Sequence, residues 1–172
     1  MSMKENSLYR VIENHPADSR VKIKENGIIQ TLSGRMGTGG GNVPMIEENA
    51  VVRRLTPLEC TRLQGYPDGW VDIGEWTDLK GKLHKDSDSP KYKALGNSIA
   101  LPFWQWMAER MVGHLKADGV ENPTMASLFD GLGGFPLVYS RCGCKPIWAS
   151  EIEEFPIAVT KIRFPEDYNS EK

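Results

Sequence analysis

Residues 125–151 read MASLFDGLGGFPLVYSRCGCKPIWASE, and this stretch decides the fold. A short apolar run at 125–129 leads into a glycine-rich turn at 130–134, a pattern typical of a buried strand that feeds a helix. The next expected elements are the start of a helix at 135–139, a strand at 146–150 and a helix at 156–163. Strands that alternate with helices predict a parallel sheet. We therefore expect an α/β fold in which one βαβα unit begins a larger sheet.

The glycine turn and the end of the second strand are candidates for a ligand site. Glycines after a strand allow a tight turn and let the backbone approach a ligand closely. Glu151 ends the next strand, where nucleotide-binding sheets place a carboxylate that accepts hydrogen bonds from ribose hydroxyls. The glycine spacing is not the dinucleotide pattern, and a plain turn beside a surface glutamate would explain the same residues.

Residues 53–66 give the clearest helix signal. Thr56 can cap the helix, Pro57 fits its first position, and Glu59 completes a capping box, while Gly65 ends it. We expect a loop at 72–91.

A second helix is expected from Pro102 to Lys116. Its expected buried face consists of the apolar residues at helical spacing, Phe103, Trp106, Met107, Met111 and Leu115. Gly96, Asn97 and Ser98 lie just before this helix, where they would form a site for a carboxylate or phosphate, or merely an N-cap segment.

The first fifty residues predict short β elements. Val21–Lys24 and residues 28–32 resemble two strands around a turn at 25–27. A flexible loop at 37–42 and one more strand at 43–46 follow.

Composition excludes several classes of protein. The 172 residues include three cysteines, too few and too odd in number for a secreted disulfide framework. We see neither a signal peptide nor an apolar run long enough to span a bilayer, so we expect a soluble, cytoplasmic protein without a membrane partner. Lys and Arg number 16 against 14 Asp and Glu in residues 1–116, and 5 against 9 in 117–172, so neither part is a basic block that calls for nucleic acid.

Four stretches together resemble the DNA cytosine-5 methyltransferases. Residues 53–67 resemble the ninth motif of that family, 93–99 the tenth, 129–135 the first and 149–151 the second. In addition, residues 31–44 resemble the segment that leaves the target-recognition region in phage-type members. The tenth motif precedes the first here, which is the order of circularly permuted or split members.

The resemblance implies a domain organisation. Residues 1–50 would end the β-rich target-recognition region, 51–116 would hold the helices of the ninth and tenth motifs, and 117–124 would be a linker. Residues 125–172 would begin the cofactor-binding sheet. The implied fold is a partial Rossmann-like methyltransferase sheet with a small β-rich remnant of the recognition domain.

The resemblance also implies the site and its cofactor, S-adenosyl-L-methionine. Phe129 and the turn of Gly131, Gly133 and Gly134 would hold the methionine part, Glu151 the ribose and Ile152 the adenine, with Asn97 and Ser98 completing the pocket. The implied partner is double-stranded DNA. Arg53 and Arg54 would bind its phosphates, although a solvated helix face or a buttress to the recognition region explains them equally well. No metal site is expected.

The catalytic motif of the family is missing. Its nucleophile is the Cys of a Pro-Cys pair, which attacks C6 of a flipped cytosine. None of Cys60, Cys142 and Cys144 follows a proline, and we interpret all three as structural. The chain alone would therefore bind cofactor weakly at best and not methylate DNA, and it would need a complementary methyltransferase subunit that carries the Pro-Cys motif. The alternatives are an inactive, truncated or rearranged remnant and a non-catalytic nucleoside-binding module.

Overall fold

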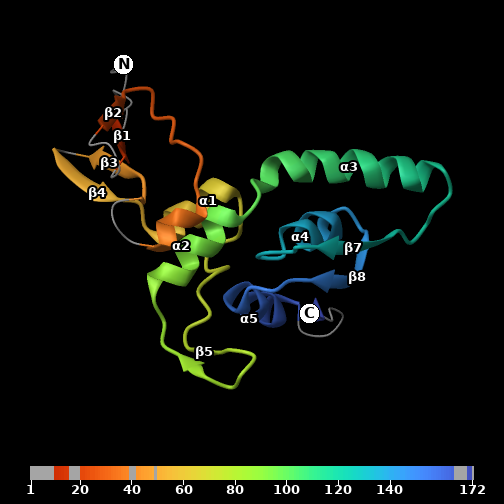
Figure 1. Cartoon of the computed structure of the whole chain (residues 1–172). Helices are drawn as coiled ribbons and strands as arrows, with labels where there is room; N and C mark the ends of the chain where they lie inside the picture. Colours follow the sequence, from red (N-terminus) through yellow and green to blue (C-terminus); the bar gives the residue numbers. More distant parts are fainter. Residues whose placement is uncertain (1–9, 16–19, 39–41, 49, 165–169, 172) are drawn as a thin grey trace, which may run out of the picture.

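The computed structural model describes residues 10–15, 20–38, 42–48, 50–164 and 170–171, which form a mixed α/β fold. Figure 1 shows an antiparallel sheet on one side, a parallel sheet on the other, and the helices α1 and α2 between them. Within the described residues no helix is long and apolar enough to cross a membrane.

The antiparallel sheet has the strand order β2-β1-β3-β4. Its strands are β1 (Arg10–His15), β2 (Arg20–Lys24), β3 (Met45–Glu48) and β4 (Val51–Arg54). The expected strand at 28–32 is wrong, because β2 pairs with the preceding β1 and not with a following strand. The strand expected at 43–46 begins two residues later, and the expected loop at 37–42 overlaps a 3-10 helix, η1 (Gly34–Thr38). Residues 39–41 lie outside the described part.

The helix α1 (Pro57–Gln64) confirms the local capping signals. The Thr56 hydroxyl accepts a hydrogen bond from the Glu59 backbone N–H at 3.2 Å, and the Glu59 carboxylate accepts one from the Thr56 N–H at 2.8 Å. Gly65 ends the helix with φ of 82°, a conformation that glycine adopts without steric cost.

The loop expected at 72–91 is only partly correct. It contains a small hairpin of β5 (Trp76–Thr77) and β6 (Leu83–His84), and from Asp88 it becomes the helix α2 (Asp88–Asn97). Gly96, Asn97 and Ser98 are thus the C-terminal end of α2 rather than a segment that only caps the next helix. The sequence did not signal α2, which packs closely against η1.

The helix α3 (Leu101–Ala117) has the expected bounds but a different buried face. It buries Leu101, Ala108 and Val112, and it packs against α4. Four of the five residues expected to be buried are instead exposed, namely Phe103, Trp106, Met111 and Leu115. The helix is therefore apolar on more than one side. Contacts within the chain bury the side that carries Leu101, Ala108 and Val112, and the other apolar side stays exposed.

The parallel sheet has the order β7-β8-β9. Its strands are β7 (Thr124–Leu128), β8 (Lys145–Ser150) and β9 (Ser170–Glu171). The helix α4 (Gly134–Arg141) connects β7 to β8, and α5 (Glu154–Arg163) follows β8. This confirms the βαβα pattern expected from residues 125–163 and adds a short third strand.

Buried hydrogen bonds join the two halves of the chain. The Trp70 indole Nε1–H donates to the carbonyl of Leu132 in the glycine turn at 2.9 Å, and the Arg163 guanidinium of α5 donates to the Trp70 carbonyl at 3.0 Å. Within the first half, the Gln64 amide at the end of α1 donates to the Leu95 carbonyl of α2 at 2.9 Å. The segments before and after residues 117–124 therefore share one core.

Candidate functional site

A pocket of about 650 Å³ lies where β7 and β8 end and α2 approaches them. Five of the residues predicted for the cofactor line it, namely Asn97, Phe129, Gly131, Glu151 and Ile152. Asn97 comes from α2, whereas the other four follow the parallel strands. Ligands of open parallel sheets bind at the carboxyl ends of the strands, so the pocket lies where such a site is expected.

The Glu151 carboxylate is fixed by backbone donors. Its Oε2 accepts from the Gly131 N–H at 2.6 Å, and its Oε1 accepts from the N–H groups of Ile152 at 2.6 Å and Glu153 at 2.9 Å. A carboxylate has about four acceptor sites, so it retains capacity for a further donor in the pocket. The Glu151 side chain, which we predicted from the sequence as a ligand contact, is thus held in one orientation by the glycine turn and the residues after β8.

The turn after β7 holds a strained residue at the pocket edge. Phe129 has φ of 53°, which is uncommon for a side chain other than glycine, and it is 81% exposed. Behind it, the buried Asp130 accepts a hydrogen bond from the Ser127 hydroxyl at 2.6 Å. Such strain in an aromatic residue beside a pocket is typical of functional sites.

Gly133 and Gly134 serve packing instead of lining the pocket. A Cβ at Gly133 would lie 2.7 Å from the Phe164 ring, and one at Gly134 would lie 2.6 Å from the Tyr66 hydroxyl oxygen. Ser98 is also absent from the pocket lining, and its hydroxyl is 2.6 Å from that of Tyr66. These residues hold the pocket walls together from behind.

The pocket has further lining residues that we did not single out from the sequence. They are Trp76, Pro90, Lys93, Ala94, Glu153, Glu154, Phe155 and Pro156. The Lys93 ammonium pairs with the Glu153 carboxylate at 2.7 Å, which joins α2 to the segment after β8. No local pattern in the sequence could reveal a pair that is 60 residues apart.

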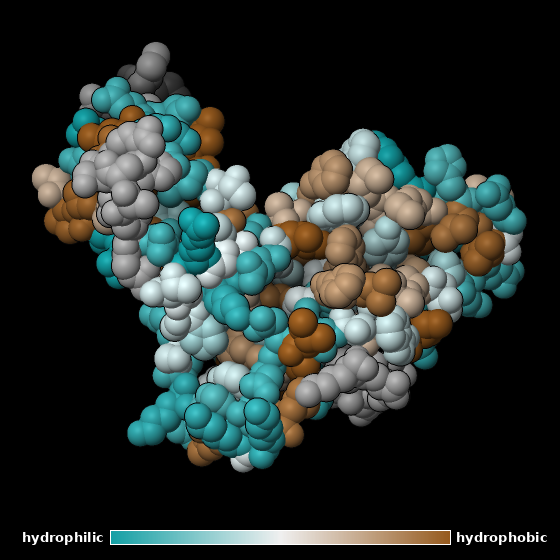
Figure 2. All heavy atoms as spheres, viewed as in Figure 1, coloured by the Kyte–Doolittle hydropathy of each residue, from teal (hydrophilic) through white to brown (hydrophobic). Residues whose placement is uncertain are grey.

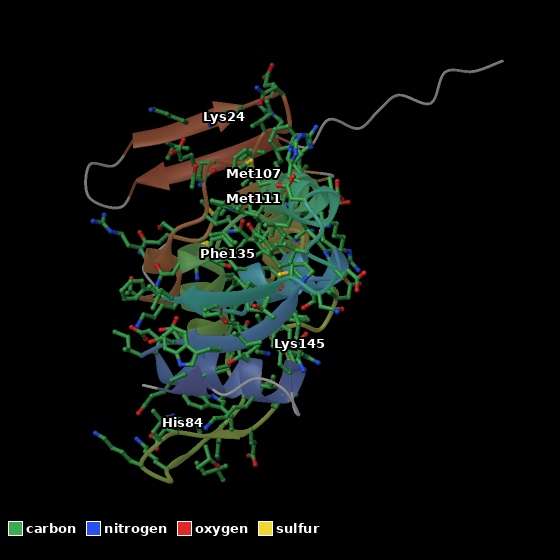
Figure 3. All side chains as sticks on the ribbon, turned by 90° about the vertical axis from the view of Figure 1, so that its right-hand side faces the viewer. Lys24, His84, Met107, Met111, Phe135 and Lys145 are labelled. Atoms are coloured by element: carbon green, nitrogen blue, oxygen red, sulfur yellow. The ribbon has the colours of Figure 1, made fainter. Side chains whose placement is uncertain are left out.

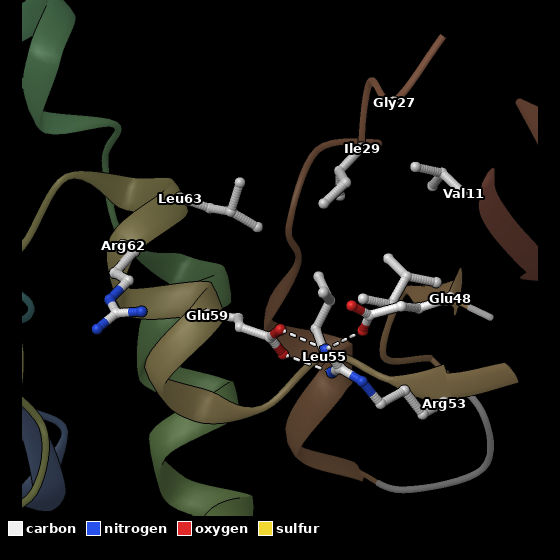
Figure 4. Close-up of a pocket in the computed structure, with 10 residues that line it drawn as sticks. Val11, Gly27, Ile29, Glu48, Arg53, Leu55, Glu59, Arg62 and Leu63 are labelled. Carbon is white, nitrogen blue, oxygen red and sulfur yellow. Dashed lines mark hydrogen bonds and ion pairs between the residues drawn. The ribbon is translucent and has the colours of Figure 1, made fainter. Parts of the chain in front are cut away.

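Arg53 lies beside a second pocket, of about 430 Å³, between the antiparallel sheet and α1 (Figure 4). Its guanidinium donates two hydrogen bonds to the Glu59 carboxylate, at 2.8 and 2.9 Å, and is 3.6 Å from Glu48. These contacts tie the antiparallel sheet to α1, while a DNA contact by Arg53 stays a prediction. Arg54 is exposed and lines a different hollow beside the start of α2.

The ion pair of Arg53 makes the stability of this region pH-dependent. Hydrogen bonds from Arg53, and from Thr56, lower the pKa of Glu59 from 4.5 to about 2. Since the folded pKa lies below the unfolded one, the stabilisation is present above pH 4.5 and is lost as the pH falls toward 2. Glu59→Gln should therefore lower the free energy of unfolding near neutral pH, and its difference from the unaltered chain should shrink across that acidic window. Urea unfolding at several pH values measures this, and a difference that does not change with pH would contradict it.

The cysteines are poorly placed for nucleophilic chemistry. Cys60 is fully buried, and burial raises the pKa of its thiol to about 12. Burial also raises the pKa of the Cys142 and Cys144 thiols. All three thiols therefore stay protonated at neutral pH, as structural cysteines do. Among the described residues no cluster of His, Cys, Asp and Glu could hold a metal ion.

The fold and this pocket define a class of protein: an α/β protein with a pocket at the carboxyl ends of parallel strands. Residues 2–113 match the family model of the C-5 cytosine-specific DNA methylases. The chain therefore belongs to this family. The matched range contains α1, α2 and most of α3, and it ends before β7.

Curated relatives are bacterial and phage methyltransferases. Type II methyltransferase M.Bsp6I of Bacillus sp. (strain RFL6) is 33% identical over 91 residues, which is 53% of this chain and 25% of the relative. Type II methyltransferase M1.ScrFI of Lactococcus lactis subsp. cremoris is 33% identical over 82 residues, 48% of this chain and 18% of the relative. A DNA N-6-adenine-methyltransferase of Escherichia phage P1 is 38% identical over 81 residues, 35% of this chain and 10% of the relative. The chain thus spans a quarter or less of the length of these relatives.

Proposed function

We propose that the chain forms part of a DNA (cytosine-5-)-methyltransferase, which transfers a methyl group from S-adenosylmethionine to C5 of cytosine in DNA. The observation that carries this proposal is the pocket that Asn97 lines together with Gly131 and Glu151. Membership of the methylase family supports DNA as the substrate. The names of the type II relatives support a role in restriction-modification, in the cytoplasm of a bacterium or phage-infected host.

The residues of the pocket fit the cofactor. The fixed Glu151 carboxylate would accept hydrogen bonds from the ribose, Ile152 would cover the adenine, and Phe129 would lie against the methionine part. Asn97, at the end of α2, would offer an amide to the same end of the cofactor. The bound cofactor would supply an electrophilic methyl group. Gly133, Gly134 and Ser98 would position these groups through packing.

The permuted motif order is compatible with this pocket. The helix α3 and the connection at 117–124 join the tenth-motif segment to β7, while the pocket itself forms through non-covalent contacts between α2 and the strand ends. We infer that the order in which the chain connects these motifs can differ from that of other family members without a change in the cofactor site.

The missing nucleophile would come from a complementary segment, which we propose is a second polypeptide with the Pro-Cys pair. Its expected contact begins at β7, which in the described part has β8 on one side and no strand on the other. Crossovers between parallel strands are right-handed as a rule, and for the order β7-β8-β9 this rule puts α4 and α5 on the same face of the sheet. On the opposite face Ala126 and Leu128 are exposed, Leu128 at 63%. Parallel sheets are normally covered on both faces, so this sheet lacks neighbours.

The outer face of α3 gives a second reason to expect a partner. Figure 2 shows hydrophobic side chains gathered over α3 and α4, and Figure 3 shows Met107, Met111 and Phe135 following one another from α3 to α4. Trp106 is 48% exposed, and the Arg110 guanidinium lies 3.6 Å from its ring centroid. In Figures 1 and 3 α3 lies on the side of β7 away from β8. A sheet that continued beyond β7 would run toward this face.

We expect the purified chain to bind S-adenosylhomocysteine but not to methylate DNA. Co-expression with a polypeptide encoded beside it that carries the Pro-Cys pair should yield a one-to-one complex with methyltransferase activity. Identification of the methylated base distinguishes C5-cytosine from N6-adenine, the base in the name of the phage P1 relative. The absence of such a reading frame, together with no cofactor binding, would identify an inactive remnant instead.

Charged substitutions test the expected contact surface. Trp106→Glu on α3 and Leu128→Asp on β7 should each abolish co-purification of the partner, because a buried unpaired charge costs several kcal/mol. Glu109→Gln on the polar side of α3 is the matched control and should leave the complex intact. A complex that survives both charged substitutions would place the partner elsewhere.

A further inference from the structure

The hairpin of β5 and β6 brings an indole to the wall of the cofactor pocket. Trp76 pairs with His84 across the hairpin, and their rings stack at 4.3 Å between centroids with an interplanar angle of 10°. The Phe155 ring, in the first turn of α5, meets the indole at 5.5 Å and 70°. Trp76 is half-buried, packs against these two rings and is one of the residues that line the pocket.

The hairpin is held in shape by one carboxylate. Asp78 Oδ1 accepts hydrogen bonds from the backbone N–H groups of Lys80 and Lys82, both at 2.9 Å. Asp78 Oδ2 lies 2.9 Å from His84 Nε2, which fixes the ring on which Trp76 stacks. The indole is therefore positioned by the protein before any ligand arrives, and a preorganised group contributes more to affinity than one that must be ordered.

The chemistry of an indole selects which part of the cofactor it contacts. S-adenosylmethionine has a zwitterionic amino-acid end, which needs charged or polar partners, and a flat adenine. Trp76 offers an apolar π-surface, and nucleobases stack favourably on such surfaces whatever their identity. Backbone groups of the glycine turn and the Asn97 amide suit the amino-acid end instead.

We propose that Trp76 is a further cofactor-binding residue, which contacts the adenine of the bound cofactor in addition to Ile152. This inference rests on the proposed function, since it assumes that the pocket takes S-adenosylmethionine. With this contact, the hairpin of β5 and β6, which lies between α1 and α2, takes part in binding the cofactor.

Isothermal titration with two probes tests the proposal. Trp76→Ala should weaken binding of S-adenosylhomocysteine and of 5'-methylthioadenosine by the same factor, about tenfold, because both probes contain adenine. Trp76→Phe should retain most of the affinity, since it keeps an aromatic ring on the same wall. Leu79→Ala is the control, because Leu79 is an exposed residue of the same hairpin. This variant should bind both probes with the affinity of the unaltered chain.

The outcomes separate this inference from the proposed function. If the unaltered chain binds S-adenosylhomocysteine and Trp76→Ala binds it equally well, the role of Trp76 is refuted while the cofactor pocket stands. If Trp76→Ala lost affinity for S-adenosylhomocysteine alone, the indole would contact the amino-acid end of the cofactor, and the proposed adenine contact would be refuted. If the unaltered chain binds neither probe, the proposed function fails and this inference fails with it. Thermal unfolding of each variant verifies the fold, and Trp76→Phe keeps the test valid if the alanine variant unfolds.

Discussion

Glu151→Gln should weaken S-adenosylhomocysteine binding on the order of a hundredfold, because a hydrogen bond to a charged group contributes about 1.5–3 kcal/mol and the carboxylate has an acceptor site left for a ribose hydroxyl. The substitution keeps the shape of the side chain but replaces one acceptor oxygen with an NH₂ group. In the unaltered chain the backbone N–H groups of Gly131, Ile152 and Glu153 donate to the carboxylate. The new NH₂ group would face at least one of these donors and could not accept its hydrogen bond. Both the ribose contact and the order of the glycine turn should therefore be lost.

Isothermal titration measures the affinity, and urea unfolding without ligand measures the accompanying loss of stability. Glu121→Gln is a suitable control, since Glu121 lies in the connection before β7, at the opposite end of the strand from the pocket. Affinity that survives in Glu151→Gln would show that this carboxylate only fixes the turn, and the ribose would then need another partner.

Gly96→Ala should cause the largest loss of stability among single substitutions that add one methyl group. A Cβ at Gly96 would lie 2.0 Å from the carbonyl oxygen of Ser33 and 2.6 Å from the backbone nitrogen of Gly34. Backbone atoms cannot rotate away as a side chain can, so α2 and η1 must separate. We expect a loss of about 3 kcal/mol and a fall of about 6–12 °C in Tm.

Gly113→Ala provides a matched control for this prediction. Gly113 lies inside α3, and a Cβ there would meet no atom within 4 Å. Alanine should stabilise the helix by about 0.5–1 kcal/mol, because it restricts the unfolded chain. Thermal unfolding of both variants measures the pair of effects. Equal changes in Tm would contradict the close packing of α2 on η1.

The elements that the sequence predicts well are those with local signals. The capping box of Thr56 and Glu59 lies within four residues, and it fixed the start of α1. The glycine turn after β7 is likewise local, and the position of Glu151 after the next strand follows from the regular length of a βαβ unit. These signals also identified Gly131 and Glu151 among the thirteen residues that line the pocket, and the family resemblance added Phe129 and Ile152.

The elements that the sequence missed depend on distant contacts. The stretch that forms α2 begins with Ser and Asp residues that favour turns, and it becomes helical where Gly96 allows close packing on η1. Residues 28–32 have strand character, yet β2 finds its partner in β1. The apolar stripe of α3 was assigned to the wrong side, because periodicity reveals that a face is apolar but not whether this chain covers it. Trp76 and Lys93 entered the pocket through such tertiary contacts.

Under the proposed assembly with a second polypeptide, the edge of β7 that has no strand beside it in the described residues would also affect how the chain is made in a cell. A strand with free N–H and C=O groups beside exposed apolar side chains is a template for unwanted pairing between copies. Copies without a partner would aggregate or be degraded, whereas those in a complex would be protected by mass action. The amount of this chain in the cell would then be set by the supply of its complement rather than by its own rate of synthesis.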